Sequence, residues 1–165
     1  HSALTDPCVP VPNMDEISFF QREQPVTYVP HRNLVLLSLA AAYAESRECT
    51  DVYYGAQRQD RYGYWDCTPE FIEKINRLLA LNRNRPVQIR APFAEMSKIE
   101  ILKAGLERRM DFSHTWTCYR GAELACGVCP ACVERLAAFD ALGIDDPLPY
   151  QHVVKTGINN PVSGI

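Results

Sequence analysis

The longest apolar stretch of the chain, residues 34–44, has the length and composition of a helix interrupted only by Ser38. Its apolar residues would lie on nearly every side of that helix, which predicts burial on several sides against a sheet. Asn33 is the expected cap, and we expect the helix to end near Ser46. The stretch is too short to span a bilayer, so no membrane partner is predicted.

Two short apolar segments, residues 51–56 and 87–89, have the pattern of buried strands. A helix is predicted between them, with Thr68 as its cap and Pro69 at its first position. Spacing of about 3.6 residues per turn places four apolar side chains of this helix on one face, namely Phe71, Ile75, Leu78 and Leu79.

Two more helices are predicted after the second strand. Ser97 and Glu100 form a capping-box pattern that opens a helix to about Arg109. Pro130 begins the last helix, whose predicted apolar residues are Val133, Leu136 and Leu142. The remaining residues, 145–165, have the composition of a loose tail.

Alternation of helices and strands predicts an α/β fold, with a parallel sheet and helices on both of its faces. Ligands of such open sheets bind at the carboxyl ends of the strands, here the loop 57–67 and the segment 91–98. Two strands make a thin sheet. Neither G-x-G-x-x-G nor G-x-x-x-x-G-K-[ST] occurs in the sequence, so the chain resembles the back half of a nucleotide-binding domain.

Composition changes this picture little. The 165 residues, 47% of them hydrophobic and 22% charged, suffice for one ordinary globular domain. A net charge of −3 disfavours nucleic acid as a partner. We predict four consecutive segments: an extended proline-rich linker (1–30), the α/β part (31–110), a metal-binding segment with a helix (111–144) and the tail (145–165).

Four of the seven cysteines, spaced C-x7-C-x2-C-x2-C, form the strongest chemical signal: Cys118, Cys126, Cys129 and Cys132. Four thiolates complete a tetrahedron and leave no open position, which indicates one structural zinc ion. An iron–sulfur cluster is an alternative, although Leu136 stands where the ferredoxin pattern needs a cysteine, and free thiols are another. Disulfides are disfavoured because the cysteine count is odd and no secretory signal is visible, so a reduced, cytoplasmic protein is expected.

Several short stretches carry a resemblance to a known family. They are Val9–Pro12, the V-P-x-R-N pattern within Thr27–Asn33, the positions Gly55, Asp60, Tyr64, Asp66 and Cys67, the triplet Ala91–Phe93, Lys98 with Glu100, Thr117–Tyr119, and Cys126–Cys132 followed by Arg135. In their order and intervals, from about residue 2 to residue 140, these stretches resemble the 7-cyano-7-deazaguanine synthase family, the ligases of queuosine and archaeosine precursor synthesis.

The resemblance implies an adenine nucleotide α-hydrolase-like (Rossmann-like) fold and an ATP-dependent carbon–nitrogen ligase. ATP, with Mg²⁺, would activate the carboxylate of 7-carboxy-7-deazaguanine, ammonia would attack, and dehydration would give the nitrile. A homodimer is also implied. Enzymes of this family begin with a strand and an S-G-G-x-D-S loop that binds the ATP phosphates. That loop does not occur in this chain, so we expect a missing N-terminal segment to supply it and the chain alone not to hydrolyse ATP.

Candidate substrate-binding residues follow from the same resemblance. Arg32 and Asn33 would approach a bound anion at a helix N-terminus, or act only as a surface arginine and a cap. The loop residues Asp60, Tyr64 and Asp66 would stack on and hydrogen-bond the deazapurine, or simply cover the core.

Other polar residues have equally plain alternatives. Lys98 would neutralise charge on a phosphate, or be solvated. No residue is assigned as catalytic, and Cys67 is interpreted as a packed thiol rather than a nucleophile. Arg120 and Arg135 flank the cysteines and are expected to compensate the negative charge of a zinc tetrathiolate.

Three positions depart from the family pattern: His31 replaces the common glycine, Trp65 a proline and Thr68 an arginine. They adjoin the expected substrate site. Two alternatives therefore stay open, a related enzyme with a different acceptor and a zinc-stabilised binding module without catalysis.

Overall fold

The structure, a computed structural model, describes residues 2–17 and 24–152. These residues form two compact units, of which the first comprises the described residues up to 10 and from 24 to 101, and the second comprises 11–17 and 102–152. The four consecutive segments stay a prediction, to which the structure adds that residues 11–17 group with the cysteine segment. Within the described ranges, no helix is both long and apolar enough to cross a membrane.

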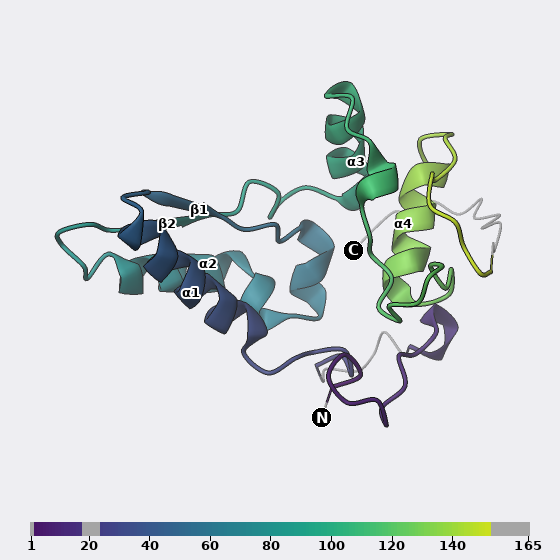
Figure 1. The fold of residues 1–165 in the computed structure, drawn as a ribbon, viewed down its shortest axis with the longest axis horizontal. Coiled ribbons are helices and arrows are strands. Elements are labelled where there is room, and N and C mark those ends of the chain that lie inside the picture. Colours follow the sequence, from purple (N-terminus) through teal and green to yellow (C-terminus); the bar gives the residue numbers. More distant parts are fainter. Residues whose placement is uncertain (1, 18–23, 153–165) are drawn as a thin grey trace. The chain divides into compact units, whose positions relative to one another are not determined.

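The first unit contains a two-stranded parallel sheet, β1 (Asp51–Tyr53) and β2 (Gln88–Arg90), in which Val52 lies opposite Ile89. Two helices, α1 (Arg32–Ser46) and α2 (Pro69–Leu79), pack on the sheet face that carries these two residues (Figure 1). The α/β class with a parallel sheet is therefore confirmed. Strand β1 is shorter than the predicted 51–56, and β2 is shifted by one residue relative to the predicted 87–89. At the carboxyl end of the pair, Tyr54 donates its N–H to the Arg90 carbonyl.

Helix α1 begins two residues earlier than predicted, and Asn33 does not cap it. The capping position is His31, which has a left-handed backbone (φ 53°) and makes no side-chain cap. Asn33 is instead buried in the first turn, where its N–H donates to the Asp66 carboxylate at 3.3 Å. A carboxylate from another part of the chain thus takes the place of a local cap.

Only one side of α1 is buried, by Leu37, Ala41 and Ala44. The burial on several sides that the sequence predicts is therefore not found in the described part of the chain. The exposed apolar stripe of α1 consists of four residues that are 54 to 64% exposed, namely Val35, Leu36, Leu39 and Tyr43.

The outer edge of β2 is closed by a side chain of α2. Asn76 donates its amide N–H to the Ile89 carbonyl at 3.0 Å and accepts the Ile89 N–H at 2.7 Å, as a neighbouring strand would. At the opposite edge of the sheet, β1 has no strand neighbour among the described residues. Because residues alternate in the direction of their backbone groups, Asp51 and Tyr53 point theirs toward this open edge.

Local capping signals predicted the next two helix starts correctly. Thr68 accepts the Phe71 N–H at 3.1 Å at the start of α2. Helix α3 (Lys98–Glu107) opens with the predicted capping box, in which the Ser97 N–H donates to Glu100 at 2.7 Å. Leu78 of α2, predicted on the buried face, is 61% exposed.

Four short 3₁₀ helices complete the described secondary structure, two of them in the predicted loop 57–67. They are Met14–Glu16, Arg58–Tyr62, Trp65–Cys67 and Phe112–His114.

The second unit is built around α4 (Pro130–Asp140), beside which the cysteine loop runs (Figure 1). Helix α4 buries Ala138 and Phe139 against Leu102, and the partly buried Leu142 packs against the same cluster. Residues 145–152 are not a loose tail, because Ala125 donates to the Pro149 carbonyl at 3.1 Å and accepts from Gln151 at 2.8 Å. The predicted tail beyond residue 152 lies outside the described residues.

Candidate metal centre and substrate site

The four cysteines of the predicted metal site come together in the second unit. Their sulfur atoms all lie within 4.8 Å of one another and their side chains are buried. Cys129 is the capping residue of α4 and Cys132 lies in its first turn, whereas Cys118 and Cys126 precede the helix. A tetrahedral ion with Zn–S bonds of about 2.3 Å needs sulfur atoms about 3.8 Å apart. The buried, soft donor set therefore fits a single ion with a closed shell.

Backbone N–H groups point at these sulfur atoms. Cys118 accepts from the N–H groups of Arg120 and Cys126, both at 3.4 Å, and Cys126 accepts from that of Cys129 at 3.3 Å. Burial acts to raise the pKa of Cys126, but hydrogen bonds from the backbone N–H groups of Val128 and Cys129, and then from the Cys129 and Cys118 side chains, outweigh it and lower the pKa to about 7. The pKa of Cys132 is raised, chiefly by burial. The backbone thus favours a thiolate at Cys126, the form that binds metal.

Gly127 allows the loop to pass under the C-terminal segment. Its φ is +78°, and a β-carbon there would lie 1.8 Å from the carbonyl oxygen of His152. No L-residue with a side chain fits this position without moving that backbone.

The side chains of the two arginines beside the cysteines bond oxygen atoms rather than the sulfur atoms, and their expected compensation of thiolate charge stays a prediction. The Arg120 guanidinium donates to Asn13 Oδ1 at 2.6 Å and to the Val11 carbonyl at 3.2 Å. Arg135 pairs with the buried carboxylate of Asp146 at 2.6 Å. Backbone dipoles, not these side chains, make the hydrogen bonds to sulfur described above.

In the first unit, the two segments that follow the strands contact each other. The Arg58 N–H donates to the Met96 carbonyl at 3.0 Å, and the Arg61 guanidinium lies 3.3 Å from the Glu95 carboxylate. The loop 57–67 and the segment 91–98 therefore form one surface at the carboxyl ends of β1 and β2, where open α/β sheets bind ligands.

Beneath this surface lies a buried polar cluster around Cys67. Its thiol accepts the amide N–H of Asn33 at 3.4 Å and lies 3.1 Å from the Tyr54 hydroxyl. Burial raises the pKa of Cys67 to about 11, which agrees with a packed thiol rather than a nucleophile. Asp66 is only 2% exposed, and its carboxylate bonds the Asn33 N–H. Tyr54, which directly follows β1, was not foreseen as part of this cluster.

The remaining candidate residues lie around it. Arg32 donates to Asn33 Oδ1 at 3.4 Å, and Asp60 accepts the Gln57 N–H at 3.0 Å. The charges of Asp60 and Asp66 act to raise the pKa of the Cys67 thiol, and that of Arg32 acts to lower it. The Tyr64 hydroxyl lies 2.7 Å from that of Thr27. Lys98 is half-buried at the first position of α3.

Two of the three residues that depart from the family pattern contact each other. The rings of His31 and Trp65 meet edge to face, with centroids 5.6 Å apart. Trp65 also donates its indole N–H to the Tyr28 hydroxyl at 2.8 Å and packs edge to face on Phe71. Thr68, the third, caps α2. The rings of Tyr28, His31, Trp65 and Phe71 therefore form one aromatic cluster next to the candidate site.

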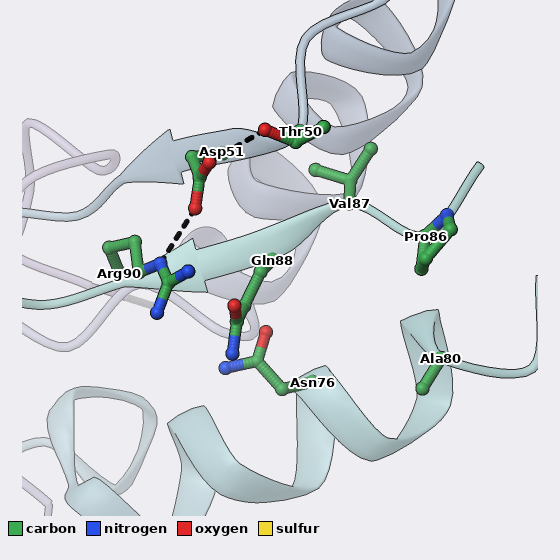
Figure 2. Close-up of a pocket in the computed structure, with 8 residues that line it drawn as sticks. All are labelled: Thr50, Asp51, Asn76, Ala80, Pro86, Val87, Gln88 and Arg90. Carbon is green, nitrogen blue, oxygen red and sulfur yellow. Dashed lines mark hydrogen bonds and ion pairs between the residues drawn. The ribbon is translucent and has the colours of Figure 1, made fainter.

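An open pocket of about 260 Å³ lies elsewhere, at the amino-terminal ends of the strands (Figure 2). Its lining includes Asp51, Arg90, Gln88 and Asn76, and Arg90 is paired with Asp51 at 2.6 Å. None of the predicted site residues lines this pocket.

Together these features define an α/β protein with a polar candidate site at the carboxyl ends of its strands and a buried four-cysteine cluster that could hold a metal ion. The sequence matches the family model described as "Queuosine biosynthesis protein QueC" over residues 1–143. The chain belongs to this QueC family, as the resemblance in its motifs predicted.

Relatives with a curated description support the same assignment. The chain is 51% identical to a 7-cyano-7-deazaguanine synthase of Marinomonas sp. (strain MWYL1) over 125 residues, which are 76% of this chain and 57% of that protein. It is 46% identical to one of Hahella chejuensis over 152 residues, covering 92% and 64%. A third, from Nostoc sp., is 41% identical over 157 residues, covering 92% and 69%. The chain thus spans little more than half the length of the first of these relatives.

Proposed function

We propose that the protein containing this chain is an ATP-dependent ligase that converts 7-carboxy-7-deazaguanine and ammonia to 7-cyano-7-deazaguanine. The observation that carries this proposal is the family membership over nearly the whole chain. Both oxygen atoms of the carboxylate must leave, one when ammonia displaces the activated oxygen and the other when the resulting amide loses water. A carboxylate oxygen is a poor leaving group, so activation by ATP with Mg²⁺ supplies the leaving group for the first step.

The phosphates of ATP would be bound by a loop that this chain does not contain, on strands that extend the sheet at β1. Three features support this. Asn76 closes the outer edge of β2, the backbone of Asp51 and Tyr53 faces an edge with no described neighbour, and the exposed apolar stripe of α1 lies on the helix that contacts β1. An added strand would satisfy the β1 edge, and helices packed beside it would cover the apolar stripe.

On the substrate side, we assign direct binding roles to Arg32, Asp60, Tyr64 and Lys98. Asn33 and Asp66 would act through the start of α1, because their polar groups are buried and bonded to each other. Arg32 at this helix start is suited to the anionic carboxylate, and Asp60 to an amino or ring N–H group of the deazapurine. Exclusion of water from this site would let ammonia attack instead of hydroxide.

The four-cysteine cluster would hold one Zn²⁺ with a structural role, since its donors leave no position for a substrate. All seven cysteines lie in the described residues and none forms a disulfide, which supports a reducing compartment such as the cytoplasm. The homodimer rests on the family resemblance alone.

The intact gene product tests the proposal. It should form the nitrile from the carboxy-deazaguanine only when ATP and ammonia are both present, as followed by mass spectrometry. Arg32→Ala should lower kcat/KM at least tenfold, whereas Arg85→Ala, a surface arginine paired with Glu48 in the same unit, should not. Failure of the folded, metal-loaded protein to form any nitrile would reject the proposal. Turnover of a different acid instead would point to an altered acceptor, for which the contact of His31 with Trp65 provides a structural reason.

A further inference from the structure

A buried ion pair lies outside the four cysteines, and neither the proposed reaction nor the metal coordination uses it. The side chains of Arg135 and Asp146 are 5% and 2% exposed. Removing two charges from water is costly, and a buried pair persists only when every donor and acceptor finds a partner. The contacts of this pair therefore indicate what it holds in place.

Every N–H donor of the Arg135 guanidinium has a partner. Asp146 accepts two of them, from Nε at 2.6 Å and from Nη2 at 2.9 Å, in the two-pronged geometry of strong arginine–carboxylate pairs. Thr115 accepts at its hydroxyl at 2.7 Å and at its carbonyl at 3.3 Å, and the Phe112 carbonyl accepts at 3.1 Å. One side chain of α4 thus binds two other chain segments.

The carboxylate of Asp146 extends the network toward the cysteines. It accepts the Tyr150 hydroxyl at 2.7 Å and the Leu148 N–H at 3.0 Å. The ring of Tyr150 packs against the cysteine cluster, and the residues on either side of Tyr150 hydrogen-bond the backbone of Ala125. Ala125 directly precedes the metal ligand Cys126.

Each ligand-bearing segment is therefore tied to this one pair. Arg135 lies on the helix that carries Cys129 and Cys132, Thr115 leads into Cys118, and the segment of Asp146 fixes the residue before Cys126. We propose that the Arg135–Asp146 pair is a positioning device that holds the four sulfurs in their binding arrangement and so sets how long the metal ion stays bound. The inference rests on the proposed zinc site.

The rate at which the protein releases zinc tests this positioning role directly. The zinc-loaded protein is mixed with excess 4-(2-pyridylazo)resorcinol and release is followed by absorbance. Asp146→Asn keeps the shape but loses the charge, and Arg135→Lys loses the forked geometry. Both should release zinc about 10- to 100-fold faster than the unchanged chain, as found when groups that orient metal ligands are removed. The matched controls Asp140→Asn and Arg108→Lys, exposed residues of the same unit, should release zinc at the original rate.

The outcomes separate the possible failures. An unchanged chain that binds no zinc would reject the zinc site itself. Variants that bind zinc and release it within twofold of the original rate, even with lowered thermal stability, would show a merely structural pair and overturn the inference. Should Arg135→Lys or Asp146→Asn fail to fold, Tyr150→Phe removes one hydrogen bond to the carboxylate. It should still accelerate release severalfold, and an unchanged rate would overturn the inference in the same way.

Discussion

The start of α1 is stabilised by the carboxylate of Asp66, which lies in a different segment of the chain. The substitution Asp66→Ala measures how much this carboxylate contributes to the free energy of unfolding. The capping position of α1 is His31, which provides no side-chain acceptor, and the Asn33 N–H bonds Asp66 instead. Loss of a hydrogen bond to a charged acceptor costs about 1.5–3 kcal/mol, and loss of a negative charge at a helix N-terminus about 0.3–1 kcal/mol. Since the bond is long at 3.3 Å, we expect the lower end, a decrease of about 2 kcal/mol in unfolding free energy.

Urea unfolding followed by tryptophan fluorescence is the assay. Trp65 belongs to the first unit and Trp116 to the second, so a Trp116→Phe background makes Trp65 the reporter of the affected unit. Asp66→Asn, which keeps an acceptor but no charge, should lose less than Asp66→Ala. Glu70→Ala, an exposed acidic residue in the first turn of α2, should change little. If Asp66→Ala unfolded within about 0.5 kcal/mol of the unchanged chain, a typical surface effect, the carboxylate would not be the cap described here.

Three more predictions concern the first unit. Asn76→Ala leaves two backbone groups of β2 without partners, so we expect a loss of about 1–3 kcal/mol in urea unfolding; an unchanged midpoint would contradict the edge-closing role. The left-handed backbone of His31 costs about 1–2 kcal/mol and its ring contact with Trp65 returns about 0.5–1.5 kcal/mol. In the unchanged chain, His31→Gly should therefore leave the free energy of unfolding nearly the same. In a chain that already carries Trp65→Ala, where no ring contact can be lost, His31→Gly should raise the free energy of unfolding. Equal effects in both backgrounds would refute the coupling. Because its pKa is raised to about 11, Cys67 should stay protonated and resist iodoacetamide through pH 9 and become reactive only as the pH approaches 11. Peptide mass mapping against the exposed Cys49 checks this, and rapid labelling of Cys67 at pH 8 would exclude a buried thiol.

Signals that act over a few residues were read correctly from the sequence. The capping pairs of α2 and α3 and the spacing of the four cysteines each concern neighbours in the chain, and the structure contains all three. The sequence also indicated the two strand-end segments as the place where a ligand would bind, which stays a prediction, and the structure adds that these segments contact each other.

Several of the failures involve partners that are not neighbours in the sequence. Asn33 looked like a cap, but the acceptor at that helix start is Asp66, which only the folded loop brings near. A tail rich in proline gave no sign that Asp146 pairs with Arg135. The apolar pattern of α1 predicted burial that the described residues do not provide, since a sequence pattern indicates which side chains need cover but not which segment supplies it.

Transfer of oxygen from the substrate tests the central claim most directly. The intact gene product is incubated with 7-carboxy-7-deazaguanine labelled with ¹⁸O in its carboxylate, together with ATP and ammonia, and the products are analysed by mass spectrometry. Activation of the carboxylate by ATP predicts the unlabelled nitrile together with ¹⁸O in AMP or in phosphate. Nitrile formed with ¹⁸O recovered only in water, or acid recovered intact from the folded, zinc-loaded protein, would contradict the account.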